Sequence, residues 1–215
     1  MIRNCRLEDI SDGRLYDIND MVKADCKDCE GCSACCRGMG SSIVLDPYDI
    51  FRLTTELDTT FEQLMAGAIE LNVVDGIVLP NLKMTGKDER CYFLNEEERC
   101  SIHSSRPGIC RLFPLGRYYE NEDFKYILQV NECKKNDRTK IKVKKWIDTP
   151  NLAKNKQFIL DWHRYLKTMQ GRINACKNDE IIKQISMSTL VKFYLTPYDS
   201  EKDFYEQFYS RLNYK

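Results

Sequence analysis

Apolar and polar positions divide the chain into two parts with different patterns. Up to about residue 148, apolar residues come in short runs that turn residues interrupt, which is typical of short strands and short helices. From about residue 149 onward, apolar residues repeat at helical spacing. The pattern therefore predicts an α+β fold in which a helical C-terminal layer covers a core of short strands and helices.

Four local signals predict where helices begin. Each combines a residue that can cap a helix N-terminus with a proline or a second polar residue at a set spacing. The pairs are Asp46 with Pro47, Thr60 with Gln63, Thr149 with Pro150, and Ser200 with Asp203. We expect the second helix to cover 61–66 and the third to end at Gly171, with a further helix over 181–193.

Short apolar runs beside turn residues predict strands. Asp75-Gly76 favours a two-residue hairpin turn, and Pro80 is expected to limit the arm that follows it. A charged turn at 96–98 separates the arms of a second expected hairpin. The predicted arms and single strands are 69–74, 77–79, 91–94, 100–102, 42–45 and 124–130.

Length and composition are those of an ordinary globular protein. The chain has 215 residues, of which 42% are apolar and 31% are charged. The N-terminus is polar, and no window approaches the roughly 20 apolar residues that a membrane span needs, so we expect a cytoplasmic protein. We predict a metal-binding domain at 1–135 and, packed on it, a basic strand with a helical part at 136–215.

Charge is unevenly distributed although the formal net charge is zero. Residues 134–177 carry 13 Lys or Arg against 3 Asp or Glu. Within this segment, 138–145 alternates lysines with apolar residues, which predicts a half-buried edge strand with a lysine face. Such a face could also contact phosphates, so a zinc module that binds nucleic acid is one alternative function, although we do not expect nucleic acid as the partner.

The strongest chemical signal is the distribution of cysteines. Five of the eleven cysteines form the pattern CxxCxxCxxCC, and four more follow downstream. Two intervening residues let a turn direct both thiolates at one metal ion, to which each bonds at about 2.3 Å in zinc sites. Ordinary disulfides are rare in a reducing compartment. We therefore predict metal ligation by Cys26, Cys29, Cys32, Cys35, Cys36, Cys91, Cys100, Cys110 and Cys133.

Nine candidate ligands exceed the four that one tetrahedral zinc ion takes. Two four-cysteine zinc sites, one 4Fe–4S cluster with spare ligands, and two clusters all fit this inventory, and we favour an iron–sulfur cluster over zinc. The adjacent Cys35 and Cys36 are expected to serve different centres or different irons, because their side chains diverge. Cys5 and Cys176 lie apart from the others and are expected to be unligated.

Histidines and arginines near the cysteines suggest supporting roles. His103 is a candidate ligand or a hydrogen-bond donor to a cluster sulfur, whereas His163 is expected to pack in the helical part or lie at its surface. Three arginines follow the spacing of the cysteines, and we expect them to hold the loops around the thiolates rather than to bind an anion. They are Arg106, Arg111 and Arg117.

Four separated segments resemble the YkgJ-type cysteine-cluster family, which is described as zinc- or iron-chelating and has the hallmark CxxCxxCC. The hallmark corresponds here to Cys29, Cys32, Cys35 and Cys36. The similarity continues through 43–50, 91–94 and 100–114, and covers about 26–133. The resemblance implies metal binding, with metal ions and a redox or protein partner as the expected partners.

The same family includes flagellin lysine methylases, so a protein-lysine N-methylase-like enzyme is the other alternative. This implication comes from the resemblance alone. The sequence has ten glycines and neither GxGxxG nor GxxxxGK[ST], so no motif indicates S-adenosylmethionine or nucleotide binding. The sequence therefore leaves open whether the chain is an enzyme.

Overall fold

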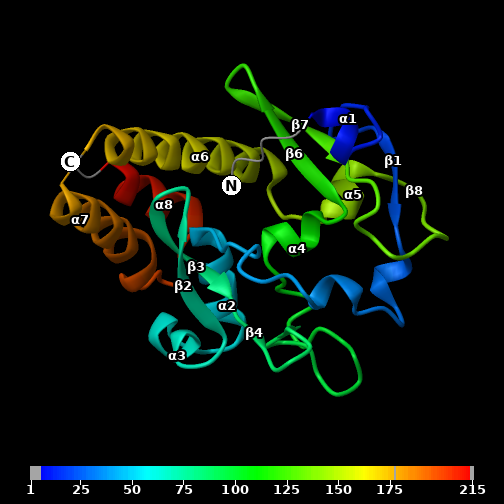
Figure 1. Ribbon diagram of the computed structural model, residues 1–215, viewed down its shortest axis with the longest axis horizontal. Helices are drawn as coiled ribbons and strands as arrows, with labels where there is room; N and C mark the ends of the chain where they lie inside the picture. The colour runs from blue at the N-terminus through cyan, green and yellow to red at the C-terminus, as the bar shows by residue number, and fades with distance from the viewer. Residues whose placement is uncertain (1–5, 177, 214–215) are drawn as a thin grey trace.

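The computed structural model describes residues 6–176 and 178–213, and the fold is α+β, as predicted (Figure 1). Within these residues the strands form four separate antiparallel pairs. The pairs are β1 (Met21–Asp25) with β8 (Thr139–Lys142), β2 (Ile69–Val74) with β3 (Ile77–Leu82), β4 (Met84–Thr85) with β5 (Arg90–Cys91), and β6 (Leu115–Glu120) with β7 (Asp123–Leu128).

Helices and short helical turns separate these pairs. The helices are α1 (Leu7–Ile10), α2 (Pro47–Glu56), α3 (Phe61–Met65), α4 (Gly108–Leu112), α5 (Val143–Ile147), α6 (Leu152–Ala175), α7 (Asp179–Leu190) and α8 (Phe204–Asn213). The 3₁₀ turns η1 (Lys27–Cys29) and η2 (Ala34–Cys36) lie in the cysteine segment, and a π-helical turn (Val191–Leu195) follows α7. No helix in the described ranges is both long and apolar enough to span a membrane.

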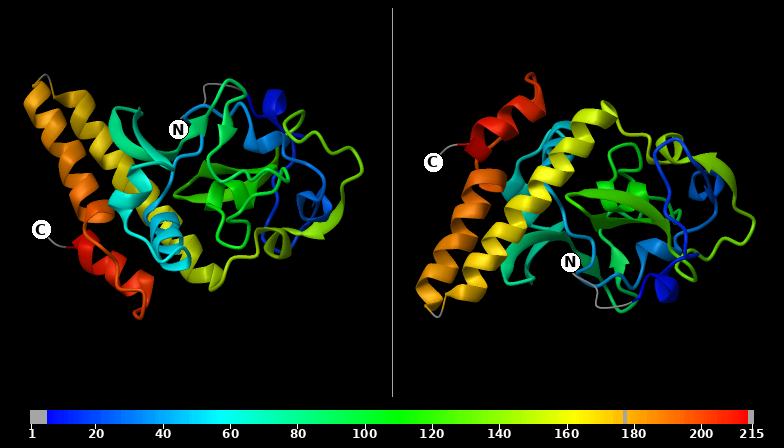
Figure 2. Two further views of the ribbon diagram at one scale, coloured as in Figure 1. Left: turned by 90° about the horizontal axis from the view of Figure 1, so that it is seen from below. Right: turned by 90° about the horizontal axis from the view of Figure 1, so that it is seen from above.

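The three C-terminal helices gather at one end of the molecule, and the first cysteine segment lies toward the other (Figure 2). Aromatic side chains fill the space between α6, the π-helical turn and α8. Phe158, Phe193 and Phe208 are each fully buried, and the ring centroids of Phe158 and Phe208 lie 4.7 Å apart. Burial of such large side chains stabilises this end of the fold without help from a ligand.

Local sequence signals set several of the observed boundaries. The predicted N-caps are present: Asp46 caps α2 with Pro47 next to it and also exchanges hydrogen bonds with Asp49, and Thr60 forms the predicted capping box with Gln63 at the start of α3. The predicted hairpin forms between β2 and β3, where Gly76 has a φ of 89° that favours glycine.

Other expected boundaries are wrong. Helix α6 has Asn151 rather than Thr149 at its N-cap, and it runs through Gly171 to Ala175, because one glycine weakens a long packed helix without ending it. Strand β3 continues past Pro80 to Leu82. Pro80 faces Leu71 at a position where an antiparallel pair needs no hydrogen bond, and its carbonyl accepts one from the Leu45 N–H at 2.9 Å instead.

Four expected strands are shorter than their patterns suggest. Residues 42–45 contribute one isolated bridge, from Val44 to Asn81, and the expected hairpin at 91–102 contains one bridge, from Leu94 to Cys100. The basic strand ends at Lys142, because Val143 begins helix α5. In each case tertiary packing overrides a short apolar run.

Candidate metal centre

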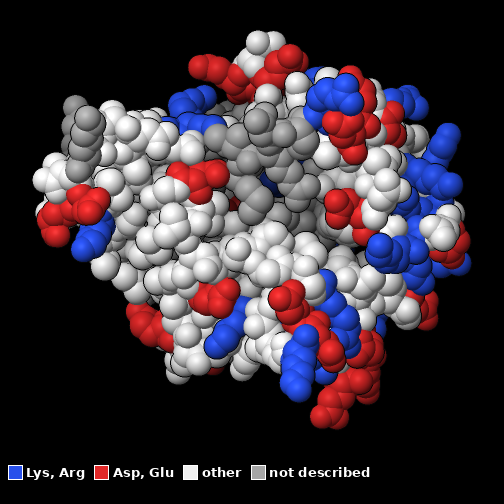
Figure 3. Space-filling model, viewed as in Figure 1, with Lys and Arg blue, Asp and Glu red and all other residues white. Residues whose placement is uncertain are grey.

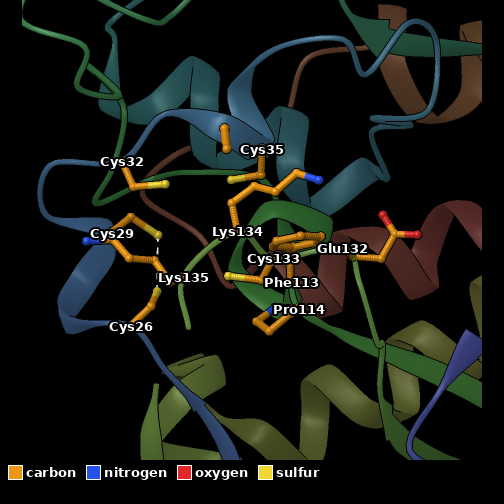
Figure 4. Close-up of a pocket in the computed structure, with 11 residues that line it drawn as sticks. Cys26, Cys29, Cys32, Cys35, Phe113, Pro114, Glu132, Cys133, Lys134 and Lys135 are labelled. Carbon is orange, nitrogen blue, oxygen red and sulfur yellow. Dashed lines mark hydrogen bonds between the residues drawn. The ribbon is translucent and has the colours of Figure 1, made fainter. Parts of the chain in front are cut away.

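Five cysteines line a small surface pocket, and we refer to them as the outer group. They come from two distant parts of the chain: 26–35, after β1, and Cys133, after β7. The pocket has a volume of about 20 Å³, and the cysteine sulfurs lie around its space (Figure 4). Its lining consists of Cys26, Cys29, Cys32, Cys35, Cys133, Ala34, Phe113, Pro114, Glu132, Lys134 and Lys135.

Tight turns bring the outer cysteines together. The backbone N–H of Cys32 donates to the Cys29 carbonyl at 3.0 Å, and the N–H of Cys36 donates to the Ser33 carbonyl at 2.9 Å. Gly31, between two of the cysteines, has a φ of 64°, in the left-handed region that glycine adopts without a steric penalty. The two-residue spacing thus lets the chain reverse repeatedly around one point.

Three further cysteines lie together behind this pocket, and we refer to them as the inner group. Cys91 ends β5, Cys100 follows the 96–98 turn, and Cys110 lies in α4. Burial raises the pKa of Cys110, and nearby thiols, those of Cys91, Cys35 and Cys100, raise it further. Cys35 therefore lies close to both groups, and its thiol also interacts with that of Cys36.

Burial and neighbouring thiols raise the pKa of several of these cysteines, which favours their protonated form in the absence of a metal. For Cys29 the contact with Cys26 lowers the pKa, but the contact with Cys35 and burial outweigh it and raise the value to about 11. For Cys35 the contact with Cys29 likewise lowers the pKa, and the contact with Cys36 and burial raise it to about 12. A metal would have to displace these protons on binding.

Arginines hold the cysteine loops in place, as the sequence predicted for Arg111. Its guanidinium donates to the carbonyls of Ser104 at 2.6 Å and Asp148 at 3.0 Å. Arg99, which the sequence did not single out for this role, donates to the Cys29 carbonyl at 2.9 Å and so links the 96–98 turn to the outer group.

His103 forms a hydrogen bond with Arg106. The bond joins the Nε2 atom of His103 to the guanidinium of Arg106. Arg117 lies over the ring of Phe124, with its guanidinium carbon 5.6 Å from the ring centroid. Arg106 also lies near the thiols of Cys29 and Cys100 and lowers their pKa values.

Asp49 is a positioning residue that the sequence reading missed. It is 4% exposed, and one carboxylate oxygen accepts from the backbone N–H of Gly108 at 2.7 Å, while the other accepts from the N–H of Asp46 at 3.0 Å. One side chain thus joins the start of α2 to the start of α4, the helix that carries Cys110. The sequence predicted Asp46 and Pro47 at the start of this helix, but not the role of Asp49 or its link to a helix 59 positions away.

The thiols are near one another without forming a finished site. Among the described residues, no three His, Cys, Asp or Glu side chains are already arranged to hold a metal ion. The sulfurs of Cys26 and Cys29 lie 3.4 Å apart. Two thiolates on one tetrahedral zinc ion, each bonded at about 2.3 Å, would lie about 3.8 Å apart, so this pair fits a shared ion after a small adjustment. An all-sulfur donor set suits zinc and iron–sulfur clusters.

Comparison with known proteins identifies this region. Residues 28–134 match the model of the CxxCxxCC family, which is described as a putative zinc- or iron-chelating domain. The chain belongs to the CxxCxxCC family. The matched CxxCxxCC domain contains every predicted ligand except Cys26, and it identifies the chain as a metal-binding cysteine-cluster protein. No curated protein and no solved structure gives a significant match.

The remaining cysteines and histidine that the sequence pointed out lie outside the CxxCxxCC domain. Cys176 follows α6, and its thiol donates to the Asn178 carbonyl at 3.7 Å, whereas Cys5 lies outside the described residues. His163 packs as expected, stacked on Tyr119 with ring centroids 3.9 Å apart. A hollow of about 200 Å³ lies between α6 and α7, lined by Tyr165, Met169, Arg172, Ile181, Gln184, Ile185 and Ser188.

Proposed function

We propose that the chain is a cytoplasmic electron-transfer or metal-handling protein whose cysteines hold iron–sulfur clusters. One observation carries the proposal: cysteines from 26–35 and from 133 line the same surface pocket. Buried thiols without a ligand would have no reason to converge from segments about a hundred residues apart, whereas ligands of one centre must. A reducing cytoplasm would keep these thiols available for metal.

The grouping of the cysteines supports two adjacent centres. In this proposal the outer group supplies ligands at the pocket, and the inner group supplies Cys91, Cys100 and Cys110, with a fourth ligand from the Cys35-Cys36 pair. The thiols of this pair interact with each other, and Cys35 also faces the inner group. If Cys35 binds one centre and Cys36 the other, the peptide bond between these two residues links the two centres directly.

The two groups would have different roles because their surroundings differ. The outer group lines a pocket at the surface, where a partner can approach. The inner cysteines do not line that pocket, and burial is the main cause that raises the pKa of Cys110. We therefore assign exchange of electrons or metal to the outer group and a structural role to the inner one.

Zinc is the second candidate, and one distance favours it. The Cys26 and Cys29 sulfurs, 3.4 Å apart, are spaced as a pair that shares a single ion. Two zinc ions would use eight thiolates, four each, and would make the centre structural rather than redox-active.

Elemental analysis with an absorption spectrum of protein purified without oxygen tests the proposal. Iron and sulfide in near-equal amounts, with a broad band near 400 nm that bleaches on reduction, would support clusters. Colourless protein with about two zinc ions per chain would support the zinc candidate. Protein that holds neither metal after reconstitution would contradict both.

Two finer proposals need separate tests. The division into a cysteine-cluster part at 1–135 and a basic and helical part at 136–215 predicts two separable unfolding steps by calorimetry. The methylase-like alternative predicts thermal stabilisation by S-adenosylmethionine, and an unchanged unfolding midpoint would count against it.

A further inference from the structure

Five exposed lysines form a basic face beside the cysteine pocket. Lys23 lies on β1, Lys140 and Lys142 flank Ile141 on β8, and Lys144 and Lys145 follow in α5. Val22 pairs with Ile141, so Lys23 and the β8 lysines point away from the core on the same two-stranded sheet. Figure 3 shows basic side chains gathered over this side of the molecule.

The five lysines of the basic face contrast with four lysines elsewhere that are paired with carboxylates. Lys125, Lys154, Lys156 and Lys202 each form an ion pair with an aspartate, at positions spread over the surface. Within the described part of the chain, none of the five has an acidic side chain within ion-pair distance. Like charges on neighbouring strands destabilise a sheet. Protection of a sheet edge explains a lysine on β8, but not those on β1 and α5.

The basic face is continuous with the rim of the pocket. Asp25, the residue before Cys26, pairs with Thr139, the residue before Lys140, so the start of β8 lies beside the outer group. Lys134 and Lys135 line the pocket itself. The Lys135 ammonium also donates to the Glu30 carbonyl at 2.8 Å, within the CxxCxxCxxCC segment.

We propose that the basic face docks an acidic partner protein, which then exchanges electrons or metal with the outer group. The exchange rests on the function proposed above, whereas the docking rests on the lysines alone. Lysines without partners in the chain would attract carboxylates of the partner and orient it toward the adjacent pocket. Small interfaces steered by charge are typical of transient redox complexes.

A protein partner fits this surface better than a nucleic acid does. Strand β8 has four residues and spans only about 13 Å, whereas tight binding to nucleic acid typically uses about 6 to 10 phosphate contacts. Acidic side chains also lie around the pocket, among them Glu132 in its lining and Asp137, which pairs with Lys27 at 3.6 Å. A continuous phosphate backbone would have to pass these carboxylates, whereas a partner protein can place its own carboxylates opposite the lysines and away from them.

Fluorescence anisotropy of the purified, metal-loaded protein with a labelled poly-glutamate peptide tests the docking. The test variant is Lys140→Glu with Lys142→Glu. The control is Lys167→Glu with Lys183→Glu, which makes the same charge change at exposed positions of α6 and α7. We expect salt-sensitive binding to the wild type and the control, and affinity about tenfold weaker in the test variant.

Lys144→Glu with Lys145→Glu, on α5, provides an independent variant if the β8 change impairs folding, and it should also weaken binding. Metal content measured on every variant should equal that of the wild type, which separates loss of docking from loss of the metal site. Equal affinity in the test and control variants would overturn the inference. So would no binding of the peptide at low salt, or tighter binding of a mixed-sequence RNA or DNA than of the peptide.

Discussion

At the scale of single residues, the cysteines differ in what surrounds them. Burial and the nearby thiols of Cys91, Cys35 and Cys100 raise the pKa of Cys110, so it lies close to members of both groups. Cys176 has only a backbone carbonyl as its partner. The two thiols therefore offer a matched pair of substitutions, one within the candidate centre and one outside it.

Replacing Cys110 with Ser should remove metal and lower stability. A serine oxygen is a poor substitute for a thiolate on zinc or iron, and metal-binding free energy in such sites is folding free energy. We expect metal per chain to fall by at least the equivalent of one site and the thermal unfolding midpoint to drop clearly. Cys176→Ser is the control and should change neither. Full metal content and an unchanged midpoint in Cys110→Ser would contradict its assignment as a ligand.

His163 should make stability depend on pH below about 6.5, the ordinary pKa of histidine. Burial against Tyr119 and the nearby Lys167 lower its pKa below the ordinary 6.5. The imidazole is therefore harder to protonate in the folded than in the unfolded state, so stability is fully present above 6.5 and is lost as the pH falls through the folded pKa. His163→Phe keeps the stacked ring without the proton. Its unfolding midpoint should fall less steeply on acidification than that of the wild type, and parallel curves would contradict this.

At the scale of elements, local signals were sufficient where a structure depends on neighbours in sequence. The caps of α2 and α3 and the β2–β3 turn agree with prediction because each involves residues three or fewer positions apart. The β6–β7 pair was half missed, since only its second strand had a clear apolar pattern. That pair leads the chain to Cys133, so the grouping of the cysteines could not be deduced from their spacing alone.

The link between α2 and α4 gives a prediction at this scale. In Asp49→Asn the side-chain oxygen can still accept from the Gly108 N–H. The side-chain NH₂ group is a donor, so it cannot accept the second bond from the Asp46 N–H. Leaving the Asp46 N–H without its acceptor should cost about 1 to 3 kcal/mol of unfolding free energy and loosen the helix that carries Cys110. Denaturant unfolding together with metal content measures both effects. Asp88→Asn makes the same chemical change at an exposed position and should be near neutral. Equal stability of the two variants would show that the link is unimportant.

At the scale of the whole molecule, the two ends are held together by different means. The helical end contains large aromatic side chains packed ring against ring, whereas the cysteine segment at 26–36 consists of short turns with few fully buried residues. The sequence indicated both features, through helical periodicity and through cysteine spacing. The pairing of β1 with β8, which joins segments far apart in the chain, left no comparable local signal.

Removing the metal should therefore affect the two ends unequally. With a strong chelator we expect 26–133 to become sensitive to protease, because short loops without a metal cannot offset their conformational entropy. Residues of α6 to α8 should stay protected by their aromatic core. Limited proteolysis followed by mass spectrometry locates the cuts. Cleavage that begins in α6 to α8, or equal protection with and without chelator, would contradict this account.

The β1–β8 pair bears on whether the cysteine region could be inserted as a segment into the chain of another protein. The chain enters this region after Asp25 and leaves it before Thr139, and these two residues face each other across one antiparallel pair. Neighbouring strands lie only about 5 Å apart, so the entrance and the exit of the region are almost at one point. A segment with adjoining ends can be inserted into a surface loop of an unrelated host without stretching either one. A transplant cut at 21–142 would carry its own closing strands, whereas one cut at 28–134 would leave them behind.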